Sequence, residues 1–484
     1  MAELLSALET RNRILSRELT AYEYVSMILE KIKQTDHRIH AYLLVQEKTA
    51  IAQAKEIDRK VKRGERVGLL AGLPVAMKDN ICTKGVRTTC SSRMLESFIP
   101  PYDATVVEKV RGEDGIIIGK TNMDEFAMGT STETSFFGPT HNPWDLSCVA
   151  GGSSGGSAAA VSAGEAALSV GSDTGGSVRC PASFCSVVGL KPTYGLVSRY
   201  GLIAYANSLD QIGPIGRNVR DCALLLDTIS GHDSKDGTSL QSNGEYLRSL
   251  SDSIEGMKVG VLSELFGSGT DPRIERHVRR EIQHLVEIGA DCEEVSLPIL
   301  EYALPAYYII ALSEASSNLA RYDGIRYGFR AQDEGLDWKS SASKTRGMGF
   351  GPEVKRRIIL GAYALSAGYY DQYYLKALKV RTLIRKDFRE AFKKVDALAG
   401  PTMPVPPFKI GERVEDPLAM YMCDIDTVPI NLAGICAVSV PCGFIEGLPV
   451  GMQIIGDVDN EKKILRIANA YEERAGYTER CPQL

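Results

Sequence analysis

Residues 149–179 read VAGGSSGGSAAAVSAGEAALSVGSDTGGSVR, and this is the most informative segment of the chain. Two clusters of glycine and serine, around Ser153 and Ser177, flank a run of small residues that contains no histidine. A serine hydroxyl attacks a carbonyl only when a base takes its proton, and the resulting oxyanion needs backbone N–H donors. Glycine lets the main chain approach that closely. The segment therefore predicts serine chemistry without an imidazole, although Gly/Ser clusters also form turns and linkers.

The candidate base is Lys78, in the upstream segment LPVAMKDNI of residues 73–81. Val75, Ala76 and Met77 form an apolar run typical of a buried strand, and burial lowers the pKa of a lysine ammonium. A lysine that is neutral near pH 7 accepts a proton, as a general base must. Asp79 follows directly, but successive strand residues point to opposite faces, so the sequence implies no pairing between them. The alternative for Lys78 is a solvated surface lysine.

Two other motifs do not fit their usual functions. GGSSG satisfies the G-x-S-x-G pattern of the α/β-hydrolase nucleophile, but that fold needs a later catalytic histidine. His277 and His284 lie on one amphipathic segment, where a packed or solvated role is expected. GIIIGKT at 115–121 has too few residues between its glycines for a phosphate loop, and its isoleucines indicate a strand. The sequence thus indicates neither ATP binding nor a metal cluster.

Composition places the chain among globular α/β proteins. Its 484 residues are 44% hydrophobic and 24% charged, which is typical of a soluble protein with a sizeable core. No linker divides it, so we expect one domain over 1–484, with an N-terminal helical layer at 1–66 and a catalytic α/β core at 67–484. The formal net charge of −5 argues against this chain gripping a phosphate backbone alone.

Cysteine usage and the N-terminal sequence bear on the compartment. The eleven cysteines are scattered without a C-x-x-C pair, which indicates reduced thiols and neither a disulfide framework nor a zinc ribbon. The start, MAELLSALETRNR, lacks the basic region of a secretory signal, and no apolar run approaches the roughly 18 residues of a membrane span. We expect a soluble, cytoplasmic protein with no membrane partner.

Periodicity predicts the main elements. A helix over 20–35 begins with a capping box of Thr20 and Glu23, and a second helix runs from about Glu47 to Lys62 and stops at Gly64. Farther along, β-branched runs such as 115–120 and 258–262 alternate with amphipathic segments such as 273–289, which predicts a sheet covered by helices. The polar stretch 331–350 is expected to be a surface loop, and 352–377 a helix.

The catalytic motifs together resemble the amidase signature family. Its lysine in V-x-x-K-D-N, serine in GGSSGG and serine in DTGGS fall on Lys78, Ser153 and Ser177. The resemblance implies a large mixed β-sheet sandwiched between helices. It also implies that Ser177 is the acyl-ester nucleophile, that Ser153, after a cis peptide, relays the proton, and that Lys78 is the base. The oxyanion hole would be the backbone of Thr174, Gly175, Gly176 and Ser177.

Longer segments at 119–129, 191–216, 313–328 and 420–434 are similar to the glutaminase subunits of tRNA-dependent amidotransferases. That resemblance implies that glutamine is hydrolysed and that ammonia passes to a partner, which uses ATP and Mg to amidate Glu-tRNA(Gln) or Asp-tRNA(Asn). The partners would be subunits B and C, the misacylated tRNA would be held mainly by the partner, and this subunit would need no cofactor. A stand-alone amidase of the same family and a catalytically silent scaffold are the alternatives.

The same resemblance suggests a glutamine clamp. Arg357 would bind the α-carboxylate, Asp424 the α-ammonium, and Tyr308 would line the pocket. The neighbouring Arg356 is an alternative to Arg357, and a core aromatic is the alternative role for Tyr308. Two residues beside the site depart from the family pattern, since Cys180 stands where glutamine is common and Ala150 where proline is common.

Overall fold

The computed structural model describes residues 5–242, 244–251, 253–267, 269–332 and 335–484. Within these ranges, eleven strands form one sheet in the order β1-β3-β2-β6-β8-β7-β12-β13-β11-β9-β10. The trios β3-β2-β6 and β11-β9-β10 are parallel, and the other neighbours are antiparallel, so the sheet is mixed as expected. The strands are β1 (Tyr42–Val45), β2 (Pro74–Lys78), β3 (Ile116–Thr121), β6 (Leu168–Asp173), β7 (Val188–Lys191), β8 (Gln211–Gly216), β9 (Lys258–Leu262), β10 (Asp291–Val295), β11 (Ala397–Pro401), β12 (Cys436–Ile445) and β13 (Leu448–Gly456). A separate pair is β4 (His141–Asn142) and β5 (Asp145–Val149).

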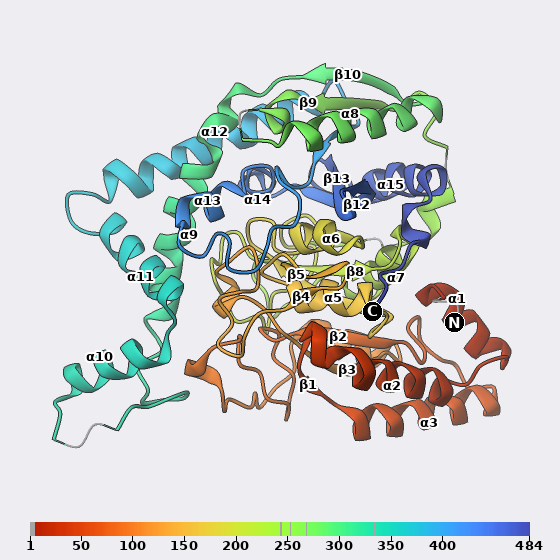
Figure 1. The fold of residues 1–484 in the computed structure, drawn as a ribbon, viewed down its shortest axis with the longest axis horizontal. Helices are drawn as coiled ribbons and strands as arrows, with labels where there is room; N and C mark the ends of the chain where they lie inside the picture. Colours follow the sequence, from red (N-terminus) through yellow and green to blue (C-terminus); the bar gives the residue numbers. More distant parts are fainter. Residues whose placement is uncertain (1–4, 243, 252, 268, 333–334) are drawn as a thin grey trace.

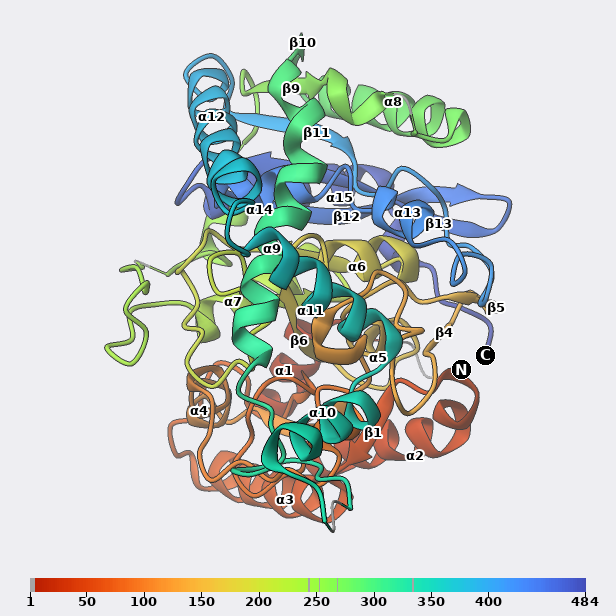
Figure 2. The same ribbon diagram turned by 90° about the vertical axis from the view of Figure 1, so that its left-hand side faces the viewer.

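Helices cover both faces of this sheet, which confirms the predicted sandwich (Figures 1 and 2). Alternate residues of a strand point to opposite faces. In β11, Ala397 and Ala399 pack in the cluster that includes helices α8 (Pro272–Glu287) and α15 (Glu461–Ala475), whereas Leu398 packs in the cluster with α9 (Ala303–Leu319) and α12 (Lys376–Ala391). The main helices beyond residue 100 are α4 (Thr105–Gly112), α5 (Gly155–Ser162), α6 (Arg179–Cys185), α7 (Val219–Ile229), α8 (Pro272–Glu287), α9 (Ala303–Leu319), α10 (Trp338–Gly349), α11 (Pro352–Ala364), α12 (Lys376–Ala391), α13 (Pro417–Met422), α14 (Val428–Ala433) and α15 (Glu461–Ala475).

The N-terminal helices are α1 (Ala7–Ser16), α2 (Ala21–Ile39) and α3 (Glu47–Arg63), in red at the lower right of Figure 1. The predicted capping box of α2 is present, since the side chains of Thr20 and Glu23 each accept from the other's backbone N–H. Helix α3 ends at Gly64, whose φ of 68° lies in the left-handed region that glycine tolerates. Between α2 and α3, β1 pairs with β3 at one edge of the sheet.

Two expectations for the region after residue 330 were wrong. The stretch 331–350 is not all loop, because α10 occupies Trp338–Gly349, with Asp337 capping it by accepting the Ser340 N–H. Its buried face consists of Ser341, Thr345 and Gly349, so a helical period without large apolar residues left no hydrophobic signal.

The helix expected over 352–377 is also interrupted. Helix α11 ends at Ala364, and α12 starts at Lys376 after a π-helical turn, η6 (Asp371–Leu375). Gly368, with a φ of 87°, breaks the helical path between them. Because the chain changes direction at this break, α11 and α12 can both pack against α9.

The parallel trio positions the chemistry-bearing residues. Strands β2, β3 and β6 end at Lys78, Thr121 and Asp173 respectively. Because carboxyl ends of parallel strands meet at one edge of a sheet, the loops that follow them converge there. These loops carry Asp124, Glu125 and Ser177.

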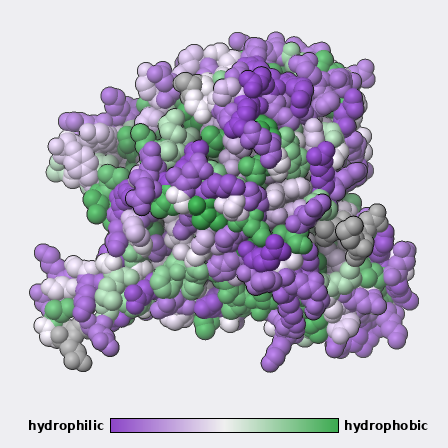
Figure 3. Space-filling model, in the orientation of Figure 1, coloured by the Kyte–Doolittle hydropathy of each residue, from purple (hydrophilic) through white to green (hydrophobic). Residues whose placement is uncertain are grey.

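The surface is largely hydrophilic on the face shown in Figure 3, most evenly over α8 at the top. Among the helices of the described ranges, none combines the length and apolar character that crossing a bilayer requires.

Candidate active site

Lys78 lies at the end of β2 with its side chain completely buried. Its Nζ is 2.7 Å from Ser153 Oγ, 2.9 Å from Ser172 Oγ and 3.1 Å from the Ser172 carbonyl oxygen. Burial lowers its pKa to about 7, although more distant carboxylates, Asp124 foremost, oppose this shift. A large fraction of the amine is therefore neutral at physiological pH and able to accept a proton.

The carboxylate next in sequence does not pair with this lysine. Asp79 accepts from the Thr89 backbone N–H at 2.8 Å and lies 3.9 Å from Lys120 Nζ. Asp79 lies just beyond the end of β2, and its partners are Thr89 and Lys120, so the expected lack of pairing with Lys78 is observed. The Lys78 ammonium instead donates to hydroxyl and carbonyl oxygens, which leave its pKa governed by burial.

Ser153 follows a cis Gly152–Ser153 peptide bond and is fully buried. The Asp124 backbone N–H donates to the Ser153 carbonyl at 3.2 Å. Gly152 packs so tightly here that a Cβ would lie 2.1 Å from Asp124 Oδ2. Ser154 acts as a support, because its hydroxyl donates to the Ser172 carbonyl at 3.1 Å and its N–H donates to the Ser177 carbonyl at 3.1 Å.

Ser177 lies between β6 and α6 and is 8% exposed, whereas Lys78 and Ser153 are inaccessible. Among the residues the structure describes, the N–H groups of Gly175 and Ser177 donate to no protein acceptor, so they are available to an oxyanion. The Gly176 N–H is already engaged, because it donates to Asp173 Oδ1 at 2.8 Å. Thr174 directs its hydroxyl to Asp210 Oδ1 at 2.7 Å.

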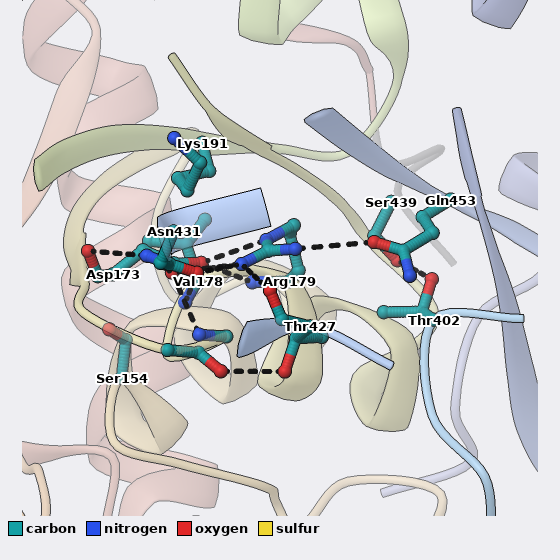
Figure 4. Close-up of polar contacts among 12 residues, drawn as sticks. Ser154, Asp173, Val178, Arg179, Lys191, Thr402, Thr427, Asn431, Ser439 and Gln453 are labelled. Carbon is teal, nitrogen blue, oxygen red and sulfur yellow. Dashed lines mark hydrogen bonds and ion pairs between the residues drawn. The ribbon is translucent and has the colours of Figure 1, made fainter. Parts of the chain in front are cut away.

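Sequence reasoning missed the buried ion pair that holds this loop (Figure 4). Arg179 Nε and Nη2 donate to the two Asp173 carboxylate oxygens, each at 3.1 Å, and both side chains are fully buried. Asp173 also accepts from the Gly176 and Val178 backbone N–H groups. Burial alone would raise the pKa of Asp173, but the Arg179 guanidinium holds it well below its usual range. Asp173 and Arg179 are the first and last residues of the DTGGSVR motif, so opposite charges at its two ends were the only signal in the sequence for this pair.

Residues from the C-terminal half complete this network. Arg179 donates to Gln453 Oε1 at 3.2 Å, to the Thr427 carbonyl at 3.1 Å and to Asn431 Oδ1 at 2.6 Å. Asn431 Nδ2 in turn donates to Asp173 Oδ1 at 2.9 Å. The loop of Ser177 is therefore anchored to β13 and α14, segments that lie far from it in sequence.

We expect Arg179→Ala to lower the free energy of unfolding by about 3–5 kcal/mol, because it leaves the buried Asp173 carboxylate without its cation. Arg220→Ala is the control, since its partner Glu473 is exposed and such pairs contribute about 0–1 kcal/mol. Chemical denaturation of both variants measures the difference. Equal losses for the two variants would contradict a supporting role for the buried pair.

One candidate clamp residue lines a cavity of about 410 Å³. Arg357, on α11, lines it and is buried, with Nε donating to Glu353 Oε1 at 2.7 Å and Nη1 to the Tyr205 hydroxyl at 2.8 Å. Arg356 also lines the cavity, but its side chain is 41% exposed and pairs with Glu353. Of the two arginines, Arg357 is thus the one held in the interior.

Asp424 and Tyr308 lie behind this cavity and contact each other. The Tyr308 hydroxyl donates to Asp424 Oδ2 at 2.7 Å, and the Thr130 hydroxyl donates to Oδ1 at 3.0 Å. Burial raises the pKa of Asp424 to about 7. The Tyr308 ring stacks on Tyr421 at 4.3 Å between centroids, and the Tyr421 hydroxyl donates to Glu353, the partner of Arg357. The Asp424 carboxyl and the Arg357 guanidinium are therefore linked through the stacked rings of Tyr308 and Tyr421 and through Glu353.

The cavity and the three candidate catalytic residues are neighbours but do not coincide. Its described lining residues include Thr130 and Ser131 but not Lys78, Ser153 or Ser177. A Cβ on Gly152 would lie 2.6 Å from the Ser131 backbone nitrogen, so the Ser153 loop packs directly against this wall of the cavity.

The two departures from the family pattern are both buried beside the site. Cys180 donates through Sγ to the Thr130 carbonyl at 3.6 Å, so it contacts the residue that supports Asp424. Burial raises the pKa of this thiol well above its usual value. Ala150 accepts, through its carbonyl, from Cys185 Sγ at 3.3 Å. Neither residue replaces a candidate catalytic group.

Comparison with known proteins gives consistent matches over nearly the whole chain. The family model described as Amidase matches residues 23–465. The A subunit of the glutamyl-tRNA(Gln) amidotransferase from Methanosarcina mazei is 56% identical over the full length of both chains. The crystal structure of the corresponding subunit from Thermotoga maritima superposes with a TM-score of 0.78 at 44% identity, covering 94% of this chain and 95% of the other. A bacterial aryl acylamidase superposes with a TM-score of 0.85 at 27% identity, covering 98% and 97%.

Proposed function

The chain belongs to the amidase family and is an enzyme, and we propose that it is the glutamine-hydrolysing subunit of a tRNA-dependent amidotransferase. The observation that carries the proposal is the buried contact of 2.7 Å between Lys78 Nζ and Ser153 Oγ, next to the loop of Ser177. A lysine with a pKa near 7 suits a general base, and the available N–H groups of Gly175 and Ser177 suit an oxyanion hole. The relatives named as A subunits of the glutamyl-tRNA(Gln) amidotransferase support a role in amide transfer, for which we propose glutamine as the amide donor.

In the proposed reaction, Ser177 Oγ attacks the side-chain amide carbon of glutamine. Ser153 takes the Ser177 proton and passes its own to neutral Lys78. The positive charge therefore forms on Lys78, which already contacts Ser153. The tetrahedral oxyanion is bound by the backbone N–H groups of Gly175 and Ser177. Collapse of this intermediate breaks the C–N bond, the proton returns through Ser153 to the leaving nitrogen, and ammonia departs. Water then hydrolyses the glutamyl ester on Ser177 by the same route.

The ammonia would be used by a partner. We propose that subunits B and C assemble with this chain, and that the partner holds the misacylated tRNA and uses ATP and Mg to activate it. Glu-tRNA(Gln), Asp-tRNA(Asn) or both are the acceptors in this proposal. This subunit itself needs no cofactor for the step described above. Co-purification with both subunits, followed by assays of glutamine hydrolysis and of tRNA amidation, tests the assignment.

A stand-alone amidase is the second candidate, because an aryl acylamidase shares the fold. The buried Arg357 and Asp424 favour glutamine. A guanidinium and a carboxylate can bind the α-carboxylate and α-ammonium of an amino acid, whereas a neutral amide offers no charge to either. A silent scaffold would form no acyl-enzyme, so a burst of product in rapid mixing would exclude it.

We expect Arg357→Ala and Asp424→Asn each to lower kcat/KM for glutamine more than about tenfold, which corresponds to about 1.4 kcal/mol. Each removes one charge-assisted contact to the amino-acid head. A simple primary amide should be affected far less, and Arg356→Ala, at the exposed neighbour, serves as the control. Equal losses on both substrates would mean that these residues only support the structure.

Asp424 should also give the KM for glutamine a pH dependence. Its carboxyl is protonated below a pKa of about 7 and then cannot pair with an ammonium, so KM should rise as the pH falls below that value. Asp424→Asn should remove this dependence.

A further inference from the structure

Glu125 is a buried carboxylate that the reaction above does not use. It lies in the loop after β3, at the start of η2 (Glu125–Ala127), is 2% exposed, and lines the same cavity as Arg357. One carboxylate oxygen, Oε1, accepts from the Ser92 hydroxyl, and Oε2 accepts from the Gly351 N–H at 2.8 Å. Burial raises its pKa to about 7, while these two hydrogen bonds favour the ionised form and oppose the rise.

The Gly351 contact lies at the beginning of α11. Gly351 is the N-cap residue, provides no side-chain cap, and is followed by Pro352 at the first helical position. A Cβ at residue 351 would be only 2.4 Å from Glu125 Oε2, so glycine permits the approach. A carboxylate here complements the positive end of the helix dipole. The start of α11 is therefore held by a residue from another part of the chain.

Helix α11 connects this contact to the clamp. Glu353 and Arg357 lie one turn apart on it and pair at 2.7 Å. Any displacement of the start of α11 relative to the sheet therefore moves the guanidinium proposed to bind the substrate carboxylate.

The other side of Glu125 leads to the catalytic loop. The preceding residue, Asp124, donates its N–H to the Ser153 carbonyl at 3.2 Å, and its carboxylate accepts from the Thr132 N–H at 2.9 Å and the Thr134 hydroxyl at 2.9 Å. Two consecutive residues thus hold the Ser153 loop and the helix of Arg357. Phe126 and Ala127, which follow, have φ values of 51° and 62°, a left-handed backbone that is unfavourable for such side chains and needs support from its surroundings.

We propose that Glu125 is a positioning residue for glutamine, whose carboxylate fixes the start of α11 against the Ser153 loop and so sets the separation between Arg357 and the serine nucleophile. This inference rests on the proposed function. It predicts that the contact matters for substrates that engage Arg357 and not for those that reach only the serines.

The test uses Glu125→Gln in the complex assembled with subunits B and C. The new glutamine side chain at position 125 has the same shape as glutamate. Its single oxygen can accept from only one of the two donors, Ser92 or Gly351, so the other donor faces an NH2 group. The KM for glutamine should rise about fivefold, the effect of one hydrogen bond, with kcat changed less than about twofold. Turnover of a simple primary amide should stay unchanged. Glu133→Gln is the matched control, because Glu133 lines the same cavity but accepts from Gly411, outside α11.

A second variant and a second measurement keep the test independent of one substitution. Ser92→Ala removes the donor that orients Glu125, so it should raise KM in the same direction, and the double variant should lose little more than Glu125→Gln alone. Hydrogen exchange should become faster at residues 351–357 in both variants, with the strands of the sheet unchanged.

An unchanged KM, or an equal fall in kcat on glutamine and on the simple amide, would overturn the positioning role. The first result would mean that α11 is fixed by other contacts, and the second that Glu125 acts through the Ser153 loop. Absence of glutamine hydrolysis by the wild-type complex would overturn the proposed function and this inference together, which distinguishes that failure from the others.

Discussion

Ser177→Ala should abolish glutamine hydrolysis, with a fall in rate of about 10⁴-fold or more, because it removes the hydroxyl proposed to form the acyl-enzyme. The same complex, with subunits B and C, should still amidate misacylated tRNA when free ammonium is supplied. The proposed nucleophile is needed only to generate ammonia, so the two half-reactions should separate. Ser153→Ala should cripple hydrolysis without unfolding the protein, since its neighbours Gly152 and Ser154 keep their backbone contacts.

Two measurements check this result. Mass spectrometry after reaction with a glutamine-mimicking chloroketone should locate the adduct on Ser177, and label on any other residue would contradict the assignment. Amidation with glutamine and with ammonium should be compared in a complex shown to be assembled and tRNA-bound. Failure of ammonium to restore amidation would mean that Ser177 acts in the transfer step or that the chain is a stand-alone amidase.

Lys78→Arg should be inactive although it preserves the positive charge, because a guanidinium stays protonated and cannot accept the Ser153 proton. In the wild-type enzyme the neutral amine is the active form. Below the Lys78 pKa of about 7 the rate should therefore fall about tenfold per pH unit, and above that value it should level off.

The pH profile must be separated from that of Asp424, whose pKa is also about 7. A simple primary amide, which needs no contact with Asp424, isolates the titration of Lys78. With this amide as substrate, kcat should rise as the pH increases through about 7, both in the wild type and in Asp424→Asn. An arginine variant with near-normal turnover, or a flat profile on the simple amide, would refute the role of Lys78 as base.

Much of the fold was predictable because its signals are local. The β-branched runs at 115–120 and 258–262 are strands, the capping box of Thr20 and Glu23 starts α2, and Gly64 ends α3. The two failures have different causes. Helix α10 buries serine, threonine and glycine, which carry no hydrophobic period, and the break between α11 and α12 depends on the backbone at Gly368.

The candidate site divides in the same way. Lys78, Ser153 and Ser177 stood out in the sequence because catalytic lysine and serine chemistry requires apolar and glycine-rich neighbours that are contiguous in the chain. Their roles stay predictions. The contacts of Lys78 with Ser172, and of Arg179 with Asn431 and Gln453, had no local signal.

The sequence by itself determined the α/β architecture and predicted the type of chemistry and the residues proposed to carry it, since these depend on local patterns of residue type. Only the tertiary structure decided that Arg357 and not Arg356 is buried, that Asp173 pairs with Arg179, and that Glu125 holds the start of α11. The physical reason is that burial, and with it each pKa and ion pair, depends on which distant segments pack together. Nothing in the sequence around Glu125 indicates that the backbone N–H of Gly351 will lie 2.8 Å from its carboxylate.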